Sequence, residues 1–334
     1  MTGELPQPIG NEAAHRSFRA AADSGAMHHA WLFTGPQGIG KASFARLAAA
    51  RLLAESADPS GLSPGFAVPE SAPTRRMIAA GSHPDYRELI RLPKDADKPD
   101  ADIARSITIA QVRALQPLFA TKPSMSPRRI VLIDAVDDLE RPGASNALLK
   151  NLEEPPAGTI FILISHAPGR LLPTIRSRCR QLRFNRLTDD EVRLALQRAL
   201  GDGAPGELDA LVRAADGAPG RGLGYAGLDI ATLDAAMTSL ATDGDPSNVA
   251  RGQLARTLGL KAAQPRYEAF LDRVPGFIAE QAGQRGGEAL RVALDAYDAA
   301  RTLSVSARAL SLEPQATVFE MAGLVARLAP ARLQ

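Results

Sequence analysis

The fold is decided by Trp31-Leu32-Phe33-Thr34-Gly35-Pro36-Gln37-Gly38-Ile39-Gly40-Lys41-Ala42-Ser43, which joins a short apolar run to a glycine-rich turn and the start of a helix. This order is typical of a P-loop, in which backbone N–H groups and the positive helix N-terminus cradle phosphates. Lys41 would reach the β- and γ-phosphates of a nucleotide. The candidate nucleotide-binding residues of this loop are Gly35, Gly38, Gly40 and Lys41.

The position after the lysine departs from the P-loop pattern. A Ser or Thr there normally coordinates Mg²⁺, whereas this chain has Ala42. Ser43 is one residue further, about 100° around a helix, so its hydroxyl points elsewhere. The sequence therefore predicts an intact phosphate loop without its usual metal ligand, and no metal site is assigned.

Composition restricts the class of protein. With 334 residues, 45% hydrophobic and 23% charged, the chain is predicted to be globular, with two or three domains. A net charge of +2 gives no global argument for binding nucleic acid or a membrane surface. The single cysteine, Cys179, excludes an internal disulfide framework. No signal-peptide pattern opens the chain and no apolar run approaches the roughly 18 residues of a membrane span, so a cytoplasmic protein is expected.

Further apolar runs predict the other strands of a sheet. Arg129–Asp134 and Thr159–Ser165 are apolar without alternation, which suits parallel strands buried on both faces. Weaker patterns predict strands at 85–90 and 180–184, and the spacing over 109–120 predicts a helix. Alternating strands and helices with a P-loop at the first turn predict a doubly wound α/β domain with a parallel sheet and flanking helices.

No strand pattern returns after Thr188. Thr188 and Glu191 have the spacing of a capping box, which predicts that a helix begins there. The last third of the chain is predicted to be all-helical. Its amphipathic helices are expected at 229–240, 249–258, 264–283, 286–303 and 314–329.

Asp134 ends its strand where P-loop proteins place the carboxylate that holds Mg²⁺. An active ATPase of this architecture normally has a glutamate next, to polarise the attacking water, and here that position is Ala135. With Ala42 and Ala135 both unsuited, the chain is not expected to hydrolyse ATP. The sequence leaves open whether Asp134 keeps a residual metal role or caps a loop.

Several motifs in order along the chain resemble the bacterial clamp-loader AAA+ family, and within it the delta-prime group of DNA polymerase III. They are the P-loop, the strand ending in Asp134, the stretch Ser145–Pro156, and Ser165–Cys179 with its Ser177-Arg178-Cys179 triplet. The resemblance is specific over about residues 8–225 and only architectural beyond. It implies an AAA+ domain at 1–186, a small helical lid at 187–225 and a helical collar at 226–334 that builds a five-subunit ring.

The resemblance also implies roles for single residues. Arg178 would be an arginine finger, projected into the ATP site of a neighbouring subunit, where its planar and always charged guanidinium can stabilise charge on the transferred phosphoryl group. Ser165 matches the sensor-1 position and Arg221 the sensor-2 position of the lid. Together with Asp134 and the loop residues, they complete the candidate nucleotide site.

The family implies partners as well. These are tau- or gamma-like ATPase subunits and a delta-like subunit in a hetero-pentameric ring, and through that ring the sliding clamp and primed DNA. Residues 53–82, where many members carry a four-cysteine zinc module, contain no cysteine, so no zinc is expected. No cofactor is required by this interpretation, and binding of ATP or ADP without turnover stays open.

The leading hypothesis is a non-hydrolysing scaffold subunit of a clamp loader in DNA replication. One alternative is a catalytically active AAA+ ATPase, the tau/gamma-like motor subunit, which would need a hydroxyl at position 42 and a carboxylate at position 135. Another is a stand-alone nucleic-acid-binding module. Such a module would need a concentrated basic surface with aromatic residues, but the aromatic content is 4%.

Overall fold

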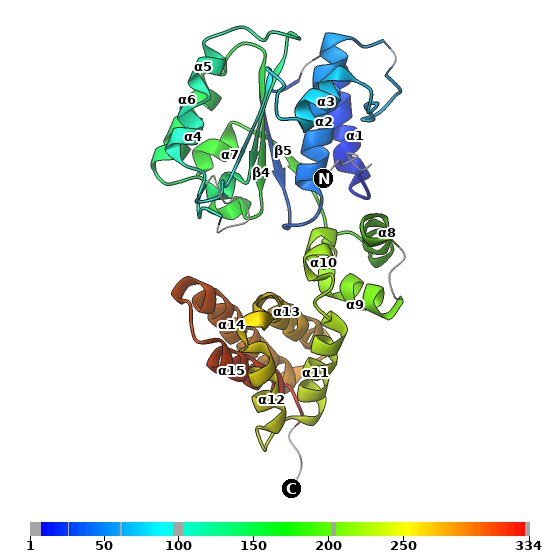
Figure 1. Cartoon of the computed structure of the whole chain (residues 1–334), viewed down its shortest axis with the longest axis vertical. Coiled ribbons are helices and arrows are strands. Elements are labelled where there is room, and N and C mark those ends of the chain that lie inside the picture. The colour runs from blue at the N-terminus through cyan, green and yellow to red at the C-terminus, as the bar shows by residue number, and fades with distance from the viewer. Residues whose placement is uncertain (1–7, 26, 61, 96–102, 202–204, 331–334) are drawn as a thin grey trace. The chain divides into compact units, whose positions relative to one another are not determined.

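The chain divides into two compact units, residues 1–187 and 188–334, in the computed structural model. The structure describes residues 8–25, 27–60, 62–95, 103–201 and 205–330. The outer ends of the predicted first and last domains, residues 1–7 and 331–334, lie outside these ranges. Figure 1 shows the sheet in the first unit and helices in the second. The finer division into a lid and a collar stays a prediction.

The first unit is built on a five-stranded parallel sheet with the strand order β2-β3-β4-β1-β5. Every residue of β1 and β4 is buried, as continuous apolar runs predict for strands covered on both faces. The predicted parallel α/β sheet is therefore confirmed. Its strands are β1 (Ala30–Thr34), β2 (Tyr86–Ile90), β3 (Arg129–Asp134), β4 (Thr159–Ser165) and β5 (Arg180–Arg183).

Helices cover both faces of this sheet (Figure 1). On one side lie α1 (Glu12–Asp23), α2 (Lys41–Ala57) and α3 (Pro73–Ala79). On the other side lie α4 (Ile109–Arg113), α5 (Gln116–Phe119), α6 (Gly143–Glu153) and α7 (Pro173–Ser177). The short 3-10 helices η1 (Val136–Asp138) and η2 (Pro168–Arg170) follow β3 and β4.

The two faces of the sheet have different cores because side chains alternate along each strand. Toward α1 and α2, Trp31 and Phe33 form an aromatic cluster with Phe18, whose ring centroid lies 4.8 Å from that of Trp31 and 5.5 Å from that of Phe33. Toward α4 and α6, Leu32 joins a largely aliphatic cluster that includes Leu148. The P-loop strand is thus fixed from both sides.

The predicted helix at 109–120 is wrong in one respect, because it consists of two short helices. α4 ends at Arg113, and α5 begins at Gln116 with Pro117 in its first turn. Proline has no N–H to donate to the preceding turn and its ring clashes with that turn, so it favours the first turn of a helix and here begins a new one. Pro117 therefore explains why the helix is interrupted between α4 and α5.

The second unit contains helices and no strand over residues 188–201 and 205–330. Thr188 accepts from the backbone of Glu191 and Glu191 reaches back, so the predicted capping box is confirmed. A helix that the sequence did not predict, α10, follows the break at Gly217. The helices are α8 (Asp189–Leu200), α9 (Pro205–Ala215), α10 (Pro219–Tyr225), α11 (Ile230–Asp243), α12 (Val249–Leu258), η3 (Lys261–Ala263), α13 (Gln264–Ala282), α14 (Gly287–Leu310) and α15 (Pro314–Ala326).

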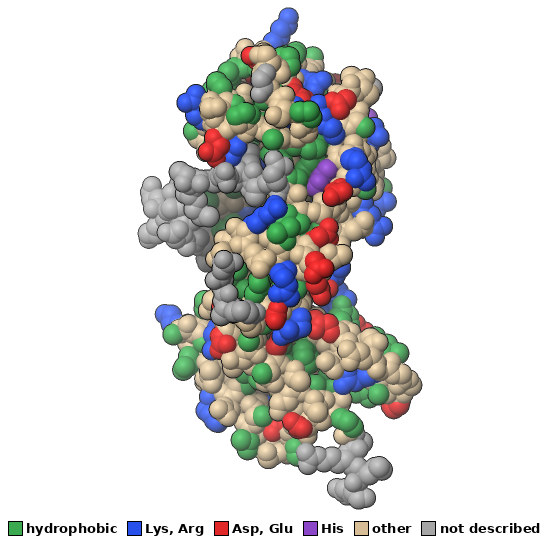
Figure 2. All heavy atoms as spheres, turned by 90° about the vertical axis from the view of Figure 1, so that its right-hand side faces the viewer, with side chains coloured by type: hydrophobic (Ala, Val, Ile, Leu, Met, Phe, Trp, Pro, Cys, Tyr) green, Lys and Arg blue, Asp and Glu red, His purple; other side chains and the backbone are tan. Residues whose placement is uncertain are grey.

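Basic and acidic side chains are interspersed on the face shown in Figure 2 and do not gather in a region of one sign. In the part of the chain that the structure describes, no helix has both the length and the apolar character needed to cross a membrane.

Candidate functional site

The phosphate loop lies where the sequence places it, between the end of β1 and the start of α2. Gly40 precedes the helix with a φ of 96°, and Gly35 has a φ of 147°. A Cβ at Gly35 would lie 2.3 Å from the carbonyl oxygen of Phe184, which follows β5. Glycine is therefore required at Gly35 both by the backbone conformation and by the close approach of a neighbouring chain segment.

Lys41 is folded back onto its own loop. Its Nζ donates hydrogen bonds to the carbonyl oxygens of Gly35 and Pro36, each at 2.6 Å, and the residue is buried. Burial lowers the pKa of Lys41 to about 8, and the negative charges of Asp134 and Asp137 oppose that shift. The lysine that a P-loop uses for phosphates is thus held by backbone carbonyls.

Asp134 lies at the end of β3 and faces a cation of its own chain. The Arg46 guanidinium on α2 is 3.6 Å from Asp134 Oδ2 and makes a closer ion pair, at 2.6 Å, with Glu88 of β2. Burial raises the pKa of Asp134, while Arg46 lowers it. No group of three or more His, Cys, Asp and Glu side chains among the described residues is placed to hold a metal ion.

Ser165 is buried at the end of β4, and its hydroxyl has a partner inside the chain. Its Oγ donates to Asp137 Oδ1 at 2.9 Å, and the backbone N–H of His166 donates to Asp137 Oδ2 at 2.5 Å. Burial, together with the positive charge of Lys41, lowers the pKa of His166 to about 4, and the negative charge of Asp137 opposes that shift. Sequence reasoning did not select Asp137 or His166. The only signal was their place after a buried strand, since Asp137 lies three residues past the end of β3 and His166 directly follows β4.

Parallel strands bring the predicted nucleotide-site residues of this unit to one edge of the sheet. Thr34 is in register with Ser165, and Asp134 is in register with Ile164. The loop, Asp134 and Ser165 therefore lie together at the carboxyl edge, where open α/β sheets bind ligands. The structure thus groups three of the motifs that are far apart in the sequence.

Arg178 lies at the opposite edge of the same sheet. It directly follows α7 and precedes β5, whose first residue, Arg180, is in register with Trp31 near the start of β1. Arg183, in register with Thr34 at the other end, is three residues later. At about 3.3 Å per residue, roughly 10 Å of strand separate these two levels. The structure therefore does not bring Arg178 together with the loop of its own chain.

The turn that carries Arg178 is anchored in the core. Ile175 is buried beside it, and Cys179 packs against the aliphatic cluster, where burial raises the pKa of its thiol to about 12. The Arg178 guanidinium itself is at the surface, 2.7 Å from Glu153 Oε1, and donates to the Thr174 carbonyl oxygen at 3.0 Å. A fixed backbone thus presents a partly exposed cation.

Arg221, the predicted sensor-2 residue, belongs to the helical unit. It lies on α10, and its NH1 is 3.5 Å from Asp216 Oδ2. Its predicted role toward a nucleotide stays a prediction.

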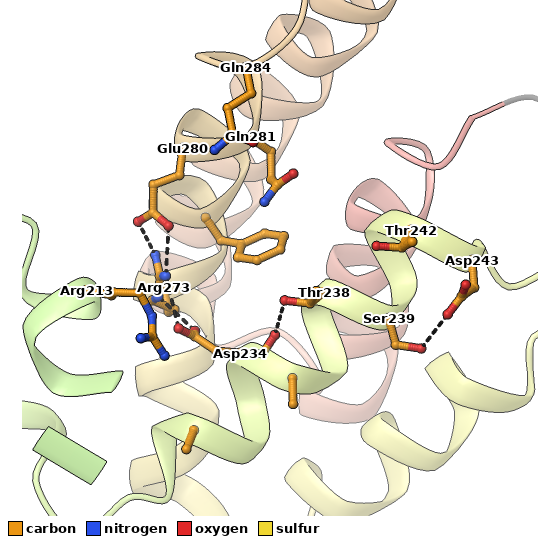
Figure 3. Close-up of a pocket in the computed structure, with 13 residues that line it drawn as sticks. Arg213, Asp234, Thr238, Ser239, Thr242, Asp243, Arg273, Glu280, Gln281 and Gln284 are labelled. Atoms are coloured by element: carbon orange, nitrogen blue, oxygen red, sulfur yellow. Dashed lines mark hydrogen bonds and ion pairs between the residues drawn. The ribbon is translucent and has the colours of Figure 1, made fainter. Parts of the chain in front are cut away.

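A cavity of about 690 Å³ in the helical unit is lined by α9, α11 and α13 (Figure 3). The buried Arg273 of α13 lies between two carboxylates there, with its Nε 2.9 Å from Asp234 Oδ1 and its NH1 2.7 Å from Glu280 Oε1. Asp234 is on α11, so this ion pair joins α11 to α13. Pairing of this kind compensates the cost of burying a charge, and the cluster has a structural role. Sequence reasoning missed it because Asp234 and Arg273 are 39 residues apart and only the packing of α11 against α13 brings them together.

Comparison with known proteins relates the first unit to a known family. Residues 10–188, more than half of the chain, match the family described as DNA polymerase III, delta subunit. The chain is similar to the DNA polymerase III subunits delta' of Pseudomonas aeruginosa (39% identical over 153 residues, 46% of this chain and 42% of the relative) and Bacillus subtilis (38% over 161 residues, 48% and 43%). It is also similar to the subunit tau of Salmonella typhimurium (30% over 283 residues, 83% and 40%).

The matched regions span only about two fifths of the length of each of these relatives. The family match covers the sheet, the phosphate loop and the Arg178 turn together. On this evidence the chain belongs to the DNA polymerase III delta-subunit family, with delta'-like sequence similarity.

Proposed function

We propose that this chain is a delta-prime-like subunit of a clamp loader, a non-hydrolysing AAA+ scaffold that helps to place a sliding clamp on primed DNA. In this proposal it assembles with tau- or gamma-like ATPase subunits and a delta-like subunit in a five-membered ring. Residues 187–225 act as the lid and 226–334 as the collar through which the ring is built. Arg178 serves as an arginine finger for the ATP site of a neighbouring subunit.

The observation that carries the proposal is the position of Arg178 on the sheet. The chain's own phosphate loop lies at the carboxyl edge, whereas Arg178 lies at the amino edge. Arg178 is therefore not placed to serve the loop of its own chain, and a partly exposed guanidinium on an anchored turn suits a role toward a neighbouring subunit. Such fingers act by stabilising charge that develops on the transferred phosphoryl group.

The carboxyl edge supports the non-hydrolysing part of the proposal. Ala42 and Ala135 replace the usual Mg²⁺ ligand and the usual water-polarising carboxylate. Lys41 is bonded to loop carbonyls and Ser165 to Asp137. The glycines and Lys41 still fit a phosphate group, so ATP or ADP binding without turnover is part of the proposal. Lys41 would have to leave its two carbonyls to take part.

The test uses a loader reconstituted from this chain, its ATPase partners, a delta-like subunit, clamp and primed DNA. The Arg178→Ala chain should assemble into the loader normally. ATP turnover should fall roughly 10³–10⁵-fold at the one neighbouring site that Arg178 completes, and the total turnover of the loader should fall by the fraction that this site contributes. Arg176→Ala is the matched control, because Arg176 is exposed on the same helix and bonds only to the Pro168 carbonyl among the described contacts. Unchanged turnover with Arg178→Ala would refute the finger assignment.

A second candidate is an active ATPase, which the similarity to a tau subunit over 83% of the chain favours. This alternative requires turnover by the purified chain alone. Under the scaffold proposal, the purified chain should show no ATP turnover above background in the presence of Mg²⁺ and DNA. Robust turnover would refute the scaffold role and support the motor role.

A further inference from the structure

The arginines around Arg178 stand in a segment without acidic residues. From Pro155 to Thr188 the chain contains no Asp or Glu. Any carboxylate that pairs with this segment must therefore come from another element. The segment holds Arg170, Arg176, Arg178, Arg180, Arg183 and Arg186.

Glu153, the last residue of α6, supplies that carboxylate to Arg178. Glu153 Oε1 lies 2.7 Å from Arg178 NH2, and the two side chains are 49% and 34% exposed. The neighbouring arginines use other contacts, since Arg176 donates to the Pro168 carbonyl and Arg180 lies over the Trp31 ring. Arg178, to which a role in a neighbouring site is assigned, is thus paired with Glu153, whereas Arg176 and Arg180 make contacts of other kinds.

We propose that Glu153 is a positioning residue that holds Arg178 against its own chain until the triphosphate of a neighbouring subunit takes its place. This inference rests on the proposed function. A guanidinium binds a carboxylate and a phosphate with the same donor geometry, so the two acceptors compete for it. A triphosphate carries more negative charge than one carboxylate and therefore wins the competition when it is present.

The strength of the ion pair suits a reversible hold. Exposed pairs of this kind are weak, because solvent screens the charges and both side chains lose freedom. Breaking the pair should therefore cost a factor of about 1.5 to 5 in affinity for any state in which Arg178 leaves Glu153. A state in which Arg178 stays on its own chain should show no such cost.

This difference can be measured as binding of the full chain to a purified tau- or gamma-type ATPase subunit. Dissociation constants would be determined with a non-hydrolysable ATP analogue and without nucleotide. The variants are Glu153→Gln, Arg178→Ala and the two combined. Glu154→Gln is the matched control, because Glu154 is the next residue, is exposed, and its side chain makes no hydrogen bond or ion pair with the described residues.

The expected result is that Glu153→Gln tightens binding about 1.5- to 5-fold with the analogue and leaves nucleotide-free binding unchanged. Glu154→Gln should match the wild type, and the gain should vanish when Arg178→Ala is also present. A Glu153→Gln variant that binds like the wild type would overturn the inference, as would a gain that persists without Arg178. Arg178→Ala tests the proposed function separately. If this substitution leaves the effect of the ATP analogue on binding unchanged, the proposed function fails, whereas a Glu153→Gln variant that behaves like the wild type overturns only the inference about Glu153.

Discussion

The polar side chains at the two edges of the sheet differ in how firmly their partners hold them. At the carboxyl edge, Lys41 is bonded to two loop carbonyls and Ser165 to Asp137. At the amino edge, Arg178 is held by a single exposed carboxylate and a carbonyl. The first set of contacts is made by the buried side chains of Lys41 and Ser165, whereas the second can be exchanged at little cost.

Under the proposed function, the fold keeps the architecture of a phosphate loop at one edge of the sheet and presents the group that acts on a partner at the other. The polar contacts of the carboxyl edge should therefore matter mainly to the stability of the unit. Those of the amino edge should matter mainly in an assembly. Trp31, the single tryptophan of the chain, is buried in β1 and provides a fluorescence probe for unfolding of this unit.

The largest effect is expected from Gly35→Ala. The new Cβ would meet the Phe184 carbonyl oxygen at 2.3 Å in a backbone conformation that alanine rarely adopts. Strain and overpacking together should lower the free energy of unfolding by about 2–6 kcal/mol, measured by denaturant unfolding followed at Trp31. Gly40→Ala is the control, because its Cβ would meet nothing within 4 Å, and it should lose only about 1–3 kcal/mol from strain. Equal losses would show that the contact with Phe184 is unimportant.

The next effect concerns pH and Lys41. Its pKa is about 8 in the folded chain, lowered by burial, against about 10.5 when unfolded. Between these values the unfolded chain holds the proton and the folded chain does not, so stability rises with pH from about 8 to 10.5. The gain should be at most about 3 kcal/mol. Lys41→Met should lack this rise, and a variant with the wild-type slope would mean that Lys41 is solvated.

Much of this fold could be predicted from particular runs of residues. Continuous apolarity in Arg129–Asp134 and Thr159–Ser165 indicates buried parallel strands because no alternation leaves a face for water. The capping-box spacing at Thr188 correctly marks where helices begin. The run from Trp31 to Ser43 predicts a strand, a glycine-rich loop and a helix in that order, and the structure has β1, the loop and α2 there.

The partners of these residues could not be predicted in the same way. Glu153 ends α6 whereas Arg178 directly follows α7, and Ser165 reaches Asp137 across 28 residues, so only the packed fold brings these partners together. The sequence does not predict whether the Lys41 side chain points to solvent or back to its own loop, because both orientations are open to a lysine. The helix α10 was missed because three of its seven residues are glycines, which lower helix propensity.

A smaller loss of stability is expected from Ser165→Ala. The variant removes the buried hydrogen bond to Asp137 and should lower the free energy of unfolding by about 1–2 kcal/mol. Ser177→Ala is the control, since its exposed hydroxyl bonds only within its own helix turn, to the Thr174 carbonyl, and should change little. If Ser165→Ala instead left stability intact and altered nucleotide binding, the hydroxyl would face a ligand and the comparison of the two edges would fail.

The smallest effect should come from the amino edge. Glu153→Gln and Arg178→Ala are each expected to change the stability of the isolated chain by less than about 1 kcal/mol, because both side chains are partly exposed. The difference between Glu153→Gln and wild type should shrink further at 1 M salt, where the Debye length falls to about 3 Å. Denaturant unfolding at low and high salt measures both quantities. A large loss would mean that the pair is part of the structural core. A small one means that Arg178 can be released without loosening the turn that Ile175 and Cys179 anchor, which is the condition that a group acting on a neighbouring subunit must meet.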